Sequence, residues 1–444
     1  MIRVFDRYLS VRNTIYFVFE NALIVLFLMS GSLIRGGWRD FVLVPLIVQV
    51  CLHYNDIYPS SQFAFREFFR RHLVAILWAV GILLAVYILS PYAPVVQGNA
   101  WMWLFAFPFI LVGLRVGYQA LVLHRRWEQP VLVVGTGQSV SMLRDEAILL
   151  RALGYRLLYM PWDASPTDNR LEAARRLTGM VAEHKINKVV VALKDRRKHL
   201  PMDVLVNLRV QGIEVVEAIS FYEQISGRIP VRLLNPSHLI FGDGFHRFAH
   251  LRVAKRLLDL LLGVVGLVLA LPLMLVLTIA IKIDSRGPVL YQQQRVGMKG
   301  RPFTLRKFRS MRPGAEDESG PVWASQNDPR VTRVGRIMRI FRLDELPQIF
   351  NVLRGEMSFV GPRPERPEFV QHLREKIPYY DLRFTVKPGL TGWAQVKYRY
   401  GANEQDALEK MQYDLYYVKH LSVMLDITIM IETIRVILNG KGAQ

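Results

Sequence analysis

The sequence predicts a membrane protein of mixed fold class, α plus α/β, in three parts. We expect a four-helix transmembrane bundle over residues 1–126, a Rossmann-like α/β cytoplasmic domain over 127–246, and a mostly helical monotopic domain with a re-entrant membrane helix over 247–444. Three observations predict this division: successive long apolar runs near the N-terminus, a polar stretch with alternating strand and helix patterns, and one later apolar run that contains a proline.

Four apolar runs open the chain, at residues 15–34, 41–58, 73–89 and 101–123. Each is close to the ~20 residues that a helix needs to cross the hydrocarbon core, and such a series is hard to bury in a soluble protein. Arginines precede the first run, separate the second from the third and follow the fourth, whereas residues 90–100 carry no charge. Because cytoplasmic loops are enriched in basic residues, we expect both ends of the bundle in the cytoplasm.

The formal net charge of +20 narrows the classes of partner. Such an excess suits nucleic acids, anionic lipids or phosphorylated substrates. The chain has no zinc-finger spacing and no RNA-binding aromatic signature, so we expect no nucleic acid partner and favour the lipid bilayer and phosphorylated molecules. The only cysteine, Cys51, lies in an apolar run, which excludes an intrachain disulfide and a metal site built from cysteines.

Residues 127–246 have the pattern of a small α/β domain. The segment 131–139 predicts a strand, a glycine turn and the start of a helix, and the apolar runs 188–193 and 212–218 predict further parallel strands. Helical patterns lie between them, at 168–184 and 202–210. Val140 stands where a dinucleotide-binding fingerprint would have its third glycine. Both a packing module and a dinucleotide-binding domain fit this pattern, and the first is favoured.

The apolar run at 257–283 is long enough to span a membrane, but its flanks argue against a crossing. Basic residues lie on both sides of the run, so both ends favour the cytoplasm. A fifth crossing would also place the rest of the chain on the opposite face from the α/β domain. Pro272 removes a backbone donor near the middle, and we predict that the helix breaks there and turns back. A plain kinked span is the alternative.

Two adjacent carboxylates, Asp344 and Glu345, are the strongest candidates for chemistry. Nearby cations would hold them ionised, as a nucleophile or a metal ligand requires. The cations that we expect to bind phosphate oxygens are Arg339, Arg363, Lys307 and Arg309. The structural alternative is an acidic pair at the solvated start of a helix. The segment before the pair alternates arginines with apolar residues, so we expect a helix in the membrane interface that brings Asp344 to the lipid surface.

Several segments resemble the bacterial sugar transferase family, the monotopic polyprenyl-phosphate hexose-1-phosphate transferases. The family's Asp-Glu-Leu-Pro-Gln block stands at 344–348 and its Gly-Pro-Arg-Pro turn at 361–364, both unaltered. Further segments at 287–311, 386–396 and 413–418 are also similar, and the resemblance extends from about residue 252 to the C-terminus. Because a bundle and an α/β domain precede this part, the chain resembles the large multi-domain type of exopolysaccharide biosynthesis.

The resemblance implies an enzyme that transfers a sugar 1-phosphate from a UDP-sugar donor to the acceptor undecaprenyl phosphate and releases UMP. It implies that Asp344 is the nucleophile, that Glu345 is the second acid and that Arg339 and Arg363 contact phosphate. It also implies a Mg²⁺ cofactor with Asp344 as a ligand. The expected location is the bacterial inner membrane, multi-pass, with the catalytic domain on the cytoplasmic face.

Two other functions stay open at this point. One is a polyprenyl-phosphate glycosyltransferase that releases UDP, although no Asp-x-Asp metal-binding element occurs in the chain. The other is a non-catalytic membrane scaffold or sensor of polysaccharide assembly. We expect a homodimer, and we interpret Asp414 as a structural partner for a basic residue, with a role in the site as the alternative.

Overall fold

The computed structural model describes residues 128–162, 170–193, 202–242, 244–245, 249–314, 330–398 and 403–438, together with a few short pieces and isolated positions before residue 128. The pieces include a small antiparallel hairpin of β1 (Ile2–Val4) and β2 (Arg7–Leu9). The four predicted transmembrane runs lie outside the described residues, apart from isolated positions, and stay predictions. The chain divides into two compact units, Met1–Ser226 and Gly227–Gln444, which we describe separately.

The first unit contains the predicted parallel α/β fold. Its sheet has the strand order β4-β3-β5-β6, and every neighbouring pair is parallel. The strands are β3 (Gln129–Gly135), β4 (Tyr155–Met160), β5 (Lys188–Ala192) and β6 (Glu214–Glu217). Strands β3, β5 and β6 confirm the strands predicted from the apolar runs, while β4 is a further strand.

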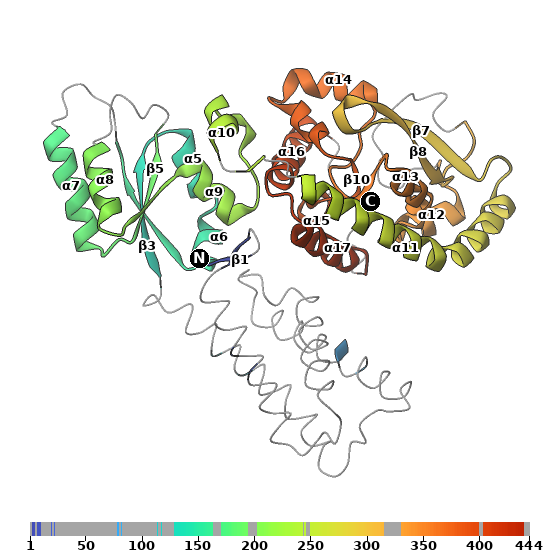
Figure 1. Ribbon diagram of the computed structural model, residues 1–444, viewed down its shortest axis with the longest axis horizontal. Coiled ribbons are helices and arrows are strands. Elements are labelled where there is room, and N and C mark those ends of the chain that lie inside the picture. The colour runs from blue at the N-terminus through green and yellow to red at the C-terminus, as the bar shows by residue number, and fades with distance from the viewer. Residues whose placement is uncertain are drawn as a thin grey trace, which may run out of the picture. The chain divides into compact units, whose positions relative to one another are not determined.

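Helices cover both faces of this sheet (Figure 1). The helices are α5 (Gln138–Asp145), α6 (Ala147–Ala152), α7 (Arg170–Glu183), α8 (Met202–Val210) and α9 (Ala218–Ser226). Val131 and Val133 of β3 pack against α5, α6 and α9, whereas Leu132 and Val134 pack against α7 and α8. Successive side chains of a strand point to opposite faces, so this central strand is apolar throughout.

Gly135 closes β3 next to β5. A Cβ on this residue would lie 2.3 Å from the carbonyl oxygen of Ala192, and its φ of +140° is open only to glycine. The first glycine of the turn is therefore required by strand packing alone. This requirement accounts for the glycine without a bound nucleotide.

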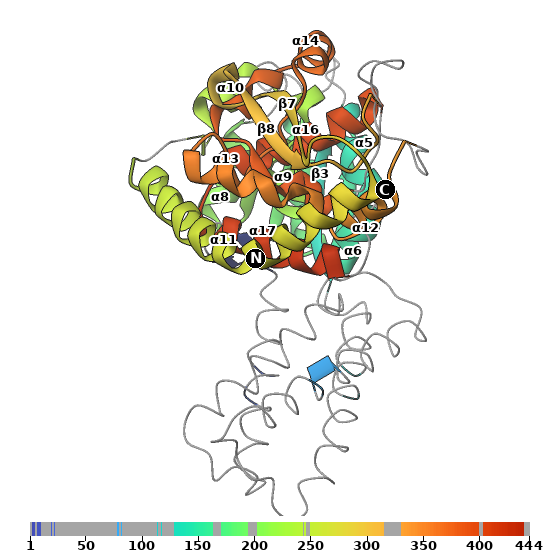
Figure 2. The same cartoon turned by 90° about the vertical axis from the view of Figure 1, so that its right-hand side faces the viewer.

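The second unit begins with a short 3₁₀ turn, η2 (Val231–Leu233), and helix α10 (Pro236–Phe241), and then enters the long helix α11 (Ala249–Asp284). Among the described residues, α11 is the one helix long and apolar enough to cross a membrane, and most of its apolar window is exposed. Pro272 lies inside it, and the helix continues on both sides of this residue. Figures 1 and 2 show that α11 is bent along its length. The predicted break at Pro272 is therefore wrong: α11 is one continuous helix, because the neighbouring turns keep their hydrogen bonds although the proline lacks a backbone donor.

Three polar residues fix the first half of α11 to the rest of the unit. Lys255 forms an ion pair of 2.6 Å with Asp426, and Arg256 donates hydrogen bonds of 2.7 Å to the carbonyl oxygens of Val352 and Leu353. Asp259, the one acid in the predicted apolar run, accepts hydrogen bonds from the Ser358 hydroxyl and the Phe359 amide, at 2.9 and 3.0 Å. Lys255 and Arg256, two of the basic residues that flank the apolar run, thus anchor α11 to the rest of the unit.

The remaining elements fold around a main apolar core and smaller buried clusters. A long hairpin joins β7 (Leu290–Val296) to β8 (Pro302–Phe308) through the turn η3 (Met298–Gly300), and a short parallel pair joins β9 (Ser358–Val360) to β10 (Gly389–Thr391). The helical elements are α12 (Arg333–Ile340), η4 (Leu343–Gln348), α13 (Ile349–Arg354), α14 (Pro367–Lys376), η5 (Tyr380–Thr385), α15 (Trp393–Lys397), α16 (Glu404–Lys419) and α17 (Val423–Leu438). Tyr417, Leu415 and Ile429 lie at the centre of this core, each no more than 1% exposed.

Candidate active site

The Asp344–Glu345 pair lies in η4, between the amphipathic helix α12 and the buried helix α13. Arg342 begins this turn in the left-handed region, with φ 55° and ψ 25°, a conformation that side chains other than glycine rarely adopt. The strained residue directs the chain sharply from α12 into the turn. Both carboxylates are buried there, each 8% exposed, which rules out the alternative of a solvated acidic helix start.

Glu345 receives two of the predicted cations. Its Oε1 atom accepts from the Lys307 ammonium at 3.3 Å and from the Arg363 guanidinium at 3.0 Å. Burial disfavours the charge of Glu345, but the cations Lys307, Arg363 and Arg342 outweigh burial and hold its pKa well below the usual range. Glu345 is therefore ionised, and it joins strand β8 and the Gly-Pro-Arg-Pro turn to the dyad.

Asp344 has a different environment. Within the part of the chain that the structure describes, no cation lies within ion-pair distance of its carboxylate. Burial raises the pKa of Asp344, and the neighbouring charge of Glu345 raises it further, while Lys307, Arg339 and Arg363 oppose the shift. We expected cations to hold both carboxylates ionised; instead they stabilise mainly Glu345. A carboxylate with a raised pKa and no directly paired cation suits a nucleophile.

Arg339 lies beside this pair. It extends from α12, and its Nε atom donates a 3.0 Å hydrogen bond to the Ser310 hydroxyl. Its charge lowers the pKa of Asp344, so Arg339, one of the residues predicted to contact phosphate, lies near the dyad. Helix α12 is held against β8 because Gly335 packs so closely on the Ser310 carbonyl that a Cβ would lie 2.0 Å from that oxygen.

Arg309 lies elsewhere. It is 6% exposed, and its guanidinium donates to the carbonyl oxygens of Ser285 and Arg286 and to the Ser285 hydroxyl, at 2.7 to 3.1 Å. These groups follow the C-terminal end of α11. The structure thus brings Lys307, Arg339 and Arg363 together with the Asp344–Glu345 pair, and it places Arg309 at the C-terminal end of α11.

We predict that Arg309→Gln lowers the thermal stability of the detergent-solubilised protein and leaves the donor KM within about twofold of the wild-type value. The variant loses hydrogen bonds from a charged donor to buried carbonyls, each worth about 1.5–3 kcal/mol. Thermal unfolding and steady-state kinetics measure the two effects. A tenfold rise in KM at unchanged stability would instead support the expected contact with the donor diphosphate.

We did not predict a role for Asn351 from the sequence. This residue is 1% exposed in α13, directly after the dyad turn. Its amide nitrogen donates to the Thr304 carbonyl at 2.8 Å and to Glu356 at 2.6 Å, and its amide oxygen accepts from the Arg306 amide at 3.4 Å. Asn351 therefore fixes α13 to β8 next to Lys307. The available signal was a polar residue inside an otherwise apolar helical segment.

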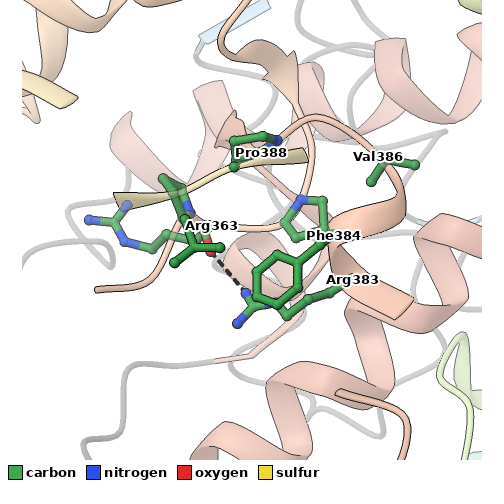
Figure 3. Close-up of a pocket in the computed structure, with 9 residues that line it drawn as sticks. Arg363, Arg383, Phe384, Val386 and Pro388 are labelled. Carbon is green, nitrogen blue, oxygen red and sulfur yellow. Dashed lines mark hydrogen bonds between the residues drawn. The ribbon is translucent and has the colours of Figure 1, made fainter. Parts of the chain in front are cut away.

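A second buried network holds the turn that carries Arg363. Arg383 donates 3.0 Å and 2.9 Å hydrogen bonds to Asp414 and to the Arg363 carbonyl oxygen, and it also donates to the Tyr380 hydroxyl. Figure 3 shows the Arg363–Arg383 part of this network at a pocket that both residues line: the Arg363 carbonyl faces Arg383, while the Arg363 guanidinium extends away from it. Asp414 is thus the partner of a basic residue, as the sequence indicated.

Asp414 provides a test of this network, because complete burial raises its pKa to about 6, although Arg383 favours its charge. A raised pKa means that the folded state holds the proton more tightly than the unfolded chain, where the value is about 3.9. Its stabilising contribution, about 3 kcal/mol, is present below about pH 4 and is lost as the pH rises through about 6. Asn cannot titrate, so the melting temperature of wild type relative to Asp414→Asn should fall between about pH 5 and pH 7.5. If the difference in melting temperature between wild type and Asp414→Asn did not change with pH, the raised pKa of Asp414 would be contradicted.

The dyad also offers a fit for Mg²⁺. Among the described residues no cluster of three or more His, Cys, Asp or Glu forms a complete metal cage. Mg²⁺ typically uses one or two carboxylates and takes its remaining ligands from substrate phosphates and water. Glu345 Oε1 is occupied by two cations, whereas Asp344 has none within ion-pair distance among the described residues, so Asp344 can serve as a ligand beside a bound diphosphate.

Comparison of the sequence with known proteins supports a functional site in this part of the chain. A sequence model described as bacterial sugar transferase matches residues 250–440, which contain every residue of the site. A protein of Xanthomonas campestris pv. campestris named UDP-glucose:undecaprenyl-phosphate glucose-1-phosphate transferase is 31% identical over 99% of this chain and 96% of its own length. An undecaprenyl-phosphate glucose phosphotransferase of Komagataeibacter xylinus is 32% identical over 88% of this chain and 73% of its own length.

A further relative differs in the sugar that its name states. The UDP-N-acetylgalactosamine-undecaprenyl-phosphate N-acetylgalactosaminephosphotransferase of Aeromonas hydrophila is 43% identical over 50% of this chain, and the chain spans 52% of that relative's length. The full-length match to the Xanthomonas protein extends the similarity beyond the C-terminal part. The chain belongs to the bacterial sugar transferase family.

Proposed function

We propose that this protein transfers a sugar 1-phosphate from a UDP-sugar to undecaprenyl phosphate, as the first step of an exopolysaccharide repeat unit. The observation that carries the proposal is the division of labour in the dyad: Glu345 is paired with Lys307 and Arg363, and Asp344 is buried without a cation within ion-pair distance among the described residues. The names of the full-length relatives supply the class of donor and acceptor.

The reaction divides into two displacements at one phosphorus atom. An Asp344 oxygen attacks the sugar-bearing phosphorus, the bond to the bridging oxygen breaks, and UMP leaves with that oxygen. The sugar phosphate is then joined to Asp344 as an acyl phosphate. An oxygen of the lipid phosphate next attacks the same phosphorus, Asp344 departs as a carboxylate, and the product is a lipid diphosphate sugar. Because the lipid phosphate is already ionised, the second step needs no strong base.

The surrounding cations offset the charge of the transferring group. Arg339 and Arg363 lie on either side of the dyad turn in sequence, and both act on Asp344. Preorganised donors of this kind contribute about 2.7–4 kcal/mol each when they meet charge that develops in the transition state. Mg²⁺, held by Asp344 and the donor diphosphate, supplies further neutralisation of phosphate charge when bound.

The location at the lipid surface follows from α11 and α12. Ile337, Ile340 and Phe341 are exposed at 42–57%, whereas Met338 on the other side of α12 is buried. These exposed apolar groups and the exposed apolar surface of α11 support a domain that enters one leaflet and keeps its site at the interface. We place α11 as a re-entrant helix, in a multi-pass protein of the bacterial inner membrane, with the site on the cytoplasmic face where nucleotide sugars occur.

Nucleotide release tests the proposal. The full-length protein in lipid nanodiscs would receive undecaprenyl phosphate, Mg²⁺ and a panel of UDP-sugars, and the released nucleotide would be separated by chromatography. We expect UMP with one sugar, released repeatedly when undecaprenyl phosphate is present and to at most one equivalent per enzyme molecule without it. Release of UDP would identify a glycosyl transfer, and release of neither nucleotide by folded protein would favour a scaffold.

A further inference from the structure

A pair of cations lies at the start of the membrane helix, apart from the dyad. Arg256 Nη2 and Lys387 Nζ are each 3.4 Å from the point where a Cβ on Gly355 would stand. The two nitrogens are therefore no further apart than twice that distance. One phosphate group can bridge such a pair, because each charge-assisted hydrogen bond spans about 2.8 Å.

Both cations are held in place by their surroundings. Arg256 caps the C-terminal end of α13 through two carbonyl oxygens. The backbone at Lys387 is equally fixed, since its carbonyl oxygen lies 2.3 Å from where a Cβ on Gly361 would stand and the next residue accepts a hydrogen bond from the Ser358 amide. The side chains thus project from rigid elements toward one point.

The local charges do not balance. Lys255 faces Lys387 as well, but it is neutralised by its ion pair with Asp426. Among the charged groups that act on Lys387, the one acid is Asp259, whose carboxylate already accepts hydrogen bonds from two neutral donors. Burial and the repulsion from Arg256 and Lys255 lower the pKa of Lys387, although Asp259 opposes the shift. No described residue accepts a hydrogen bond from the Lys387 ammonium, so the pair is arranged for an anion that the protein itself does not provide.

The position of the pair indicates which anion. Exposed apolar residues of α11 begin beside Arg256, with Val253 at 58% and Leu257 at 61% exposure. A charge pair at the edge of a lipid-facing surface is at the depth of headgroups. The acceptor phosphate must reach Asp344, but α13, six residues or about 9 Å long, separates the pair from the dyad turn. A headgroup bound here would therefore stay in place while substrate reacts.

We propose that Arg256 and Lys387 form a binding site for the phosphate headgroup of an anionic membrane lipid, which fixes α11 at its point of entry. The proposal rests on the membrane placement of α11 given above. The backbone of Lys387 packs on Gly361, two residues before Arg363, so a lipid held by the Lys387 ammonium acts on that turn through this residue. The site thus joins the lipid composition of the membrane to the stability of the active-site turn.

Trace amine labelling of the wild-type full-length protein tests this site. The protein in maltoside micelles would react with an acetylating reagent near pH 8, and mass spectrometry would report the rate at Lys387 relative to Lys282, at the other end of α11. Phosphatidylglycerol should slow the Lys387 reaction about tenfold against this internal control, because a bound anion within ~4–6 Å raises the pKa of an amine by about one unit. Phosphatidylcholine should slow it much less.

Three results would overturn the proposal. Equal labelling rates of Lys387 in the two lipids would show that the site does not select an anionic headgroup. Equal protection by inorganic phosphate would assign the pair to a free anion, and stronger protection by undecaprenyl phosphate would assign it to the acceptor. Native mass spectrometry adds an independent readout: wild type and Lys376→Gln should retain one more phosphatidylglycerol than Lys387→Gln. Flotation with vesicles checks membrane placement separately, so its failure is distinguishable from failure of the site.

Discussion

Asp344→Asn should abolish sugar phosphate transfer, with a loss in kcat on the order of 10⁴-fold or more. An amide cannot form the acyl phosphate through which the sugar phosphate passes, and no other described carboxylate is free in the site. The variant should remain folded, because Asn replaces a carboxylate whose charge is disfavoured by burial. UMP release in nanodiscs and thermal unfolding measure the two quantities on the same preparation.

Asp381→Asn is a matched control for this prediction. It removes a carboxylate from the same unit, at a side chain that is 66% exposed and forms an ion pair with Arg374. We expect activity within about twofold of wild type, as for most exposed substitutions. If Asp344→Asn kept activity comparable to this control, Asp344 would not be the nucleophile.

Arg363→Gln should reduce kcat by about 10²–10³-fold, the second largest effect that we expect. The guanidinium donates to Glu345 and lowers the pKa of Asp344. Its removal therefore weakens charge neutralisation at the transferring phosphorus, while Lys307 still donates to Glu345. Steady-state kinetics over a range of donor concentrations separates the fall in kcat from a rise in KM.

Arg374→Gln serves as the control for Arg363. This residue is exposed on α14 and pairs with Asp381 at 2.6 Å, away from the dyad. It should retain near wild-type kcat. An Arg363→Gln variant with unchanged kcat and altered KM alone would show that Arg363 binds the ground state of the donor rather than the transition state.

The sequence was sufficient for the parts of the fold with a strong local pattern. The buried strands β3 and β5 carry uninterrupted apolar runs, and α7 and α8 have helical periodicity, so each was predictable. The hairpin β7–β8 was not, because its exposed run of three glutamines lacks the apolar alternation typical of strands. Element β9 has three residues, too few to carry any period.

In the site, the dyad and Arg363 could be placed together because their motifs are close in sequence. Lys307 and Arg309 were both expected to bind phosphate oxygens, but the structure separates them, because successive side chains of a strand alternate only while the strand lasts. Strand β8 ends at Phe308, so the alternation stops before Arg309, which turns toward the end of α11. Arg383 and Asn351 were missed because the partners that join them to the site, Arg363, Asp414, Thr304 and Arg306, lie 20 to 47 residues away along the chain.

The electrostatic difference between Asp344 and Glu345 was also beyond the sequence. Adjacent carboxylates share the same nearby arginines along the chain, yet only Glu345 meets Lys307 and Arg363 directly. Folding thus separates two chemically similar groups into an anchored acid and a nucleophile with a raised pKa.

The covalent intermediate is the central claim, and label transfer tests it most directly. The protein in nanodiscs without acceptor lipid would receive Mg²⁺ and a UDP-sugar labelled with ³²P at the sugar-bearing phosphorus. We predict that label appears on the peptide that contains Asp344, is absent from Asp344→Asn, and leaves the protein when undecaprenyl phosphate is added. Lipid product formed at full rate with no labelled protein, or label on a different residue, would contradict the account.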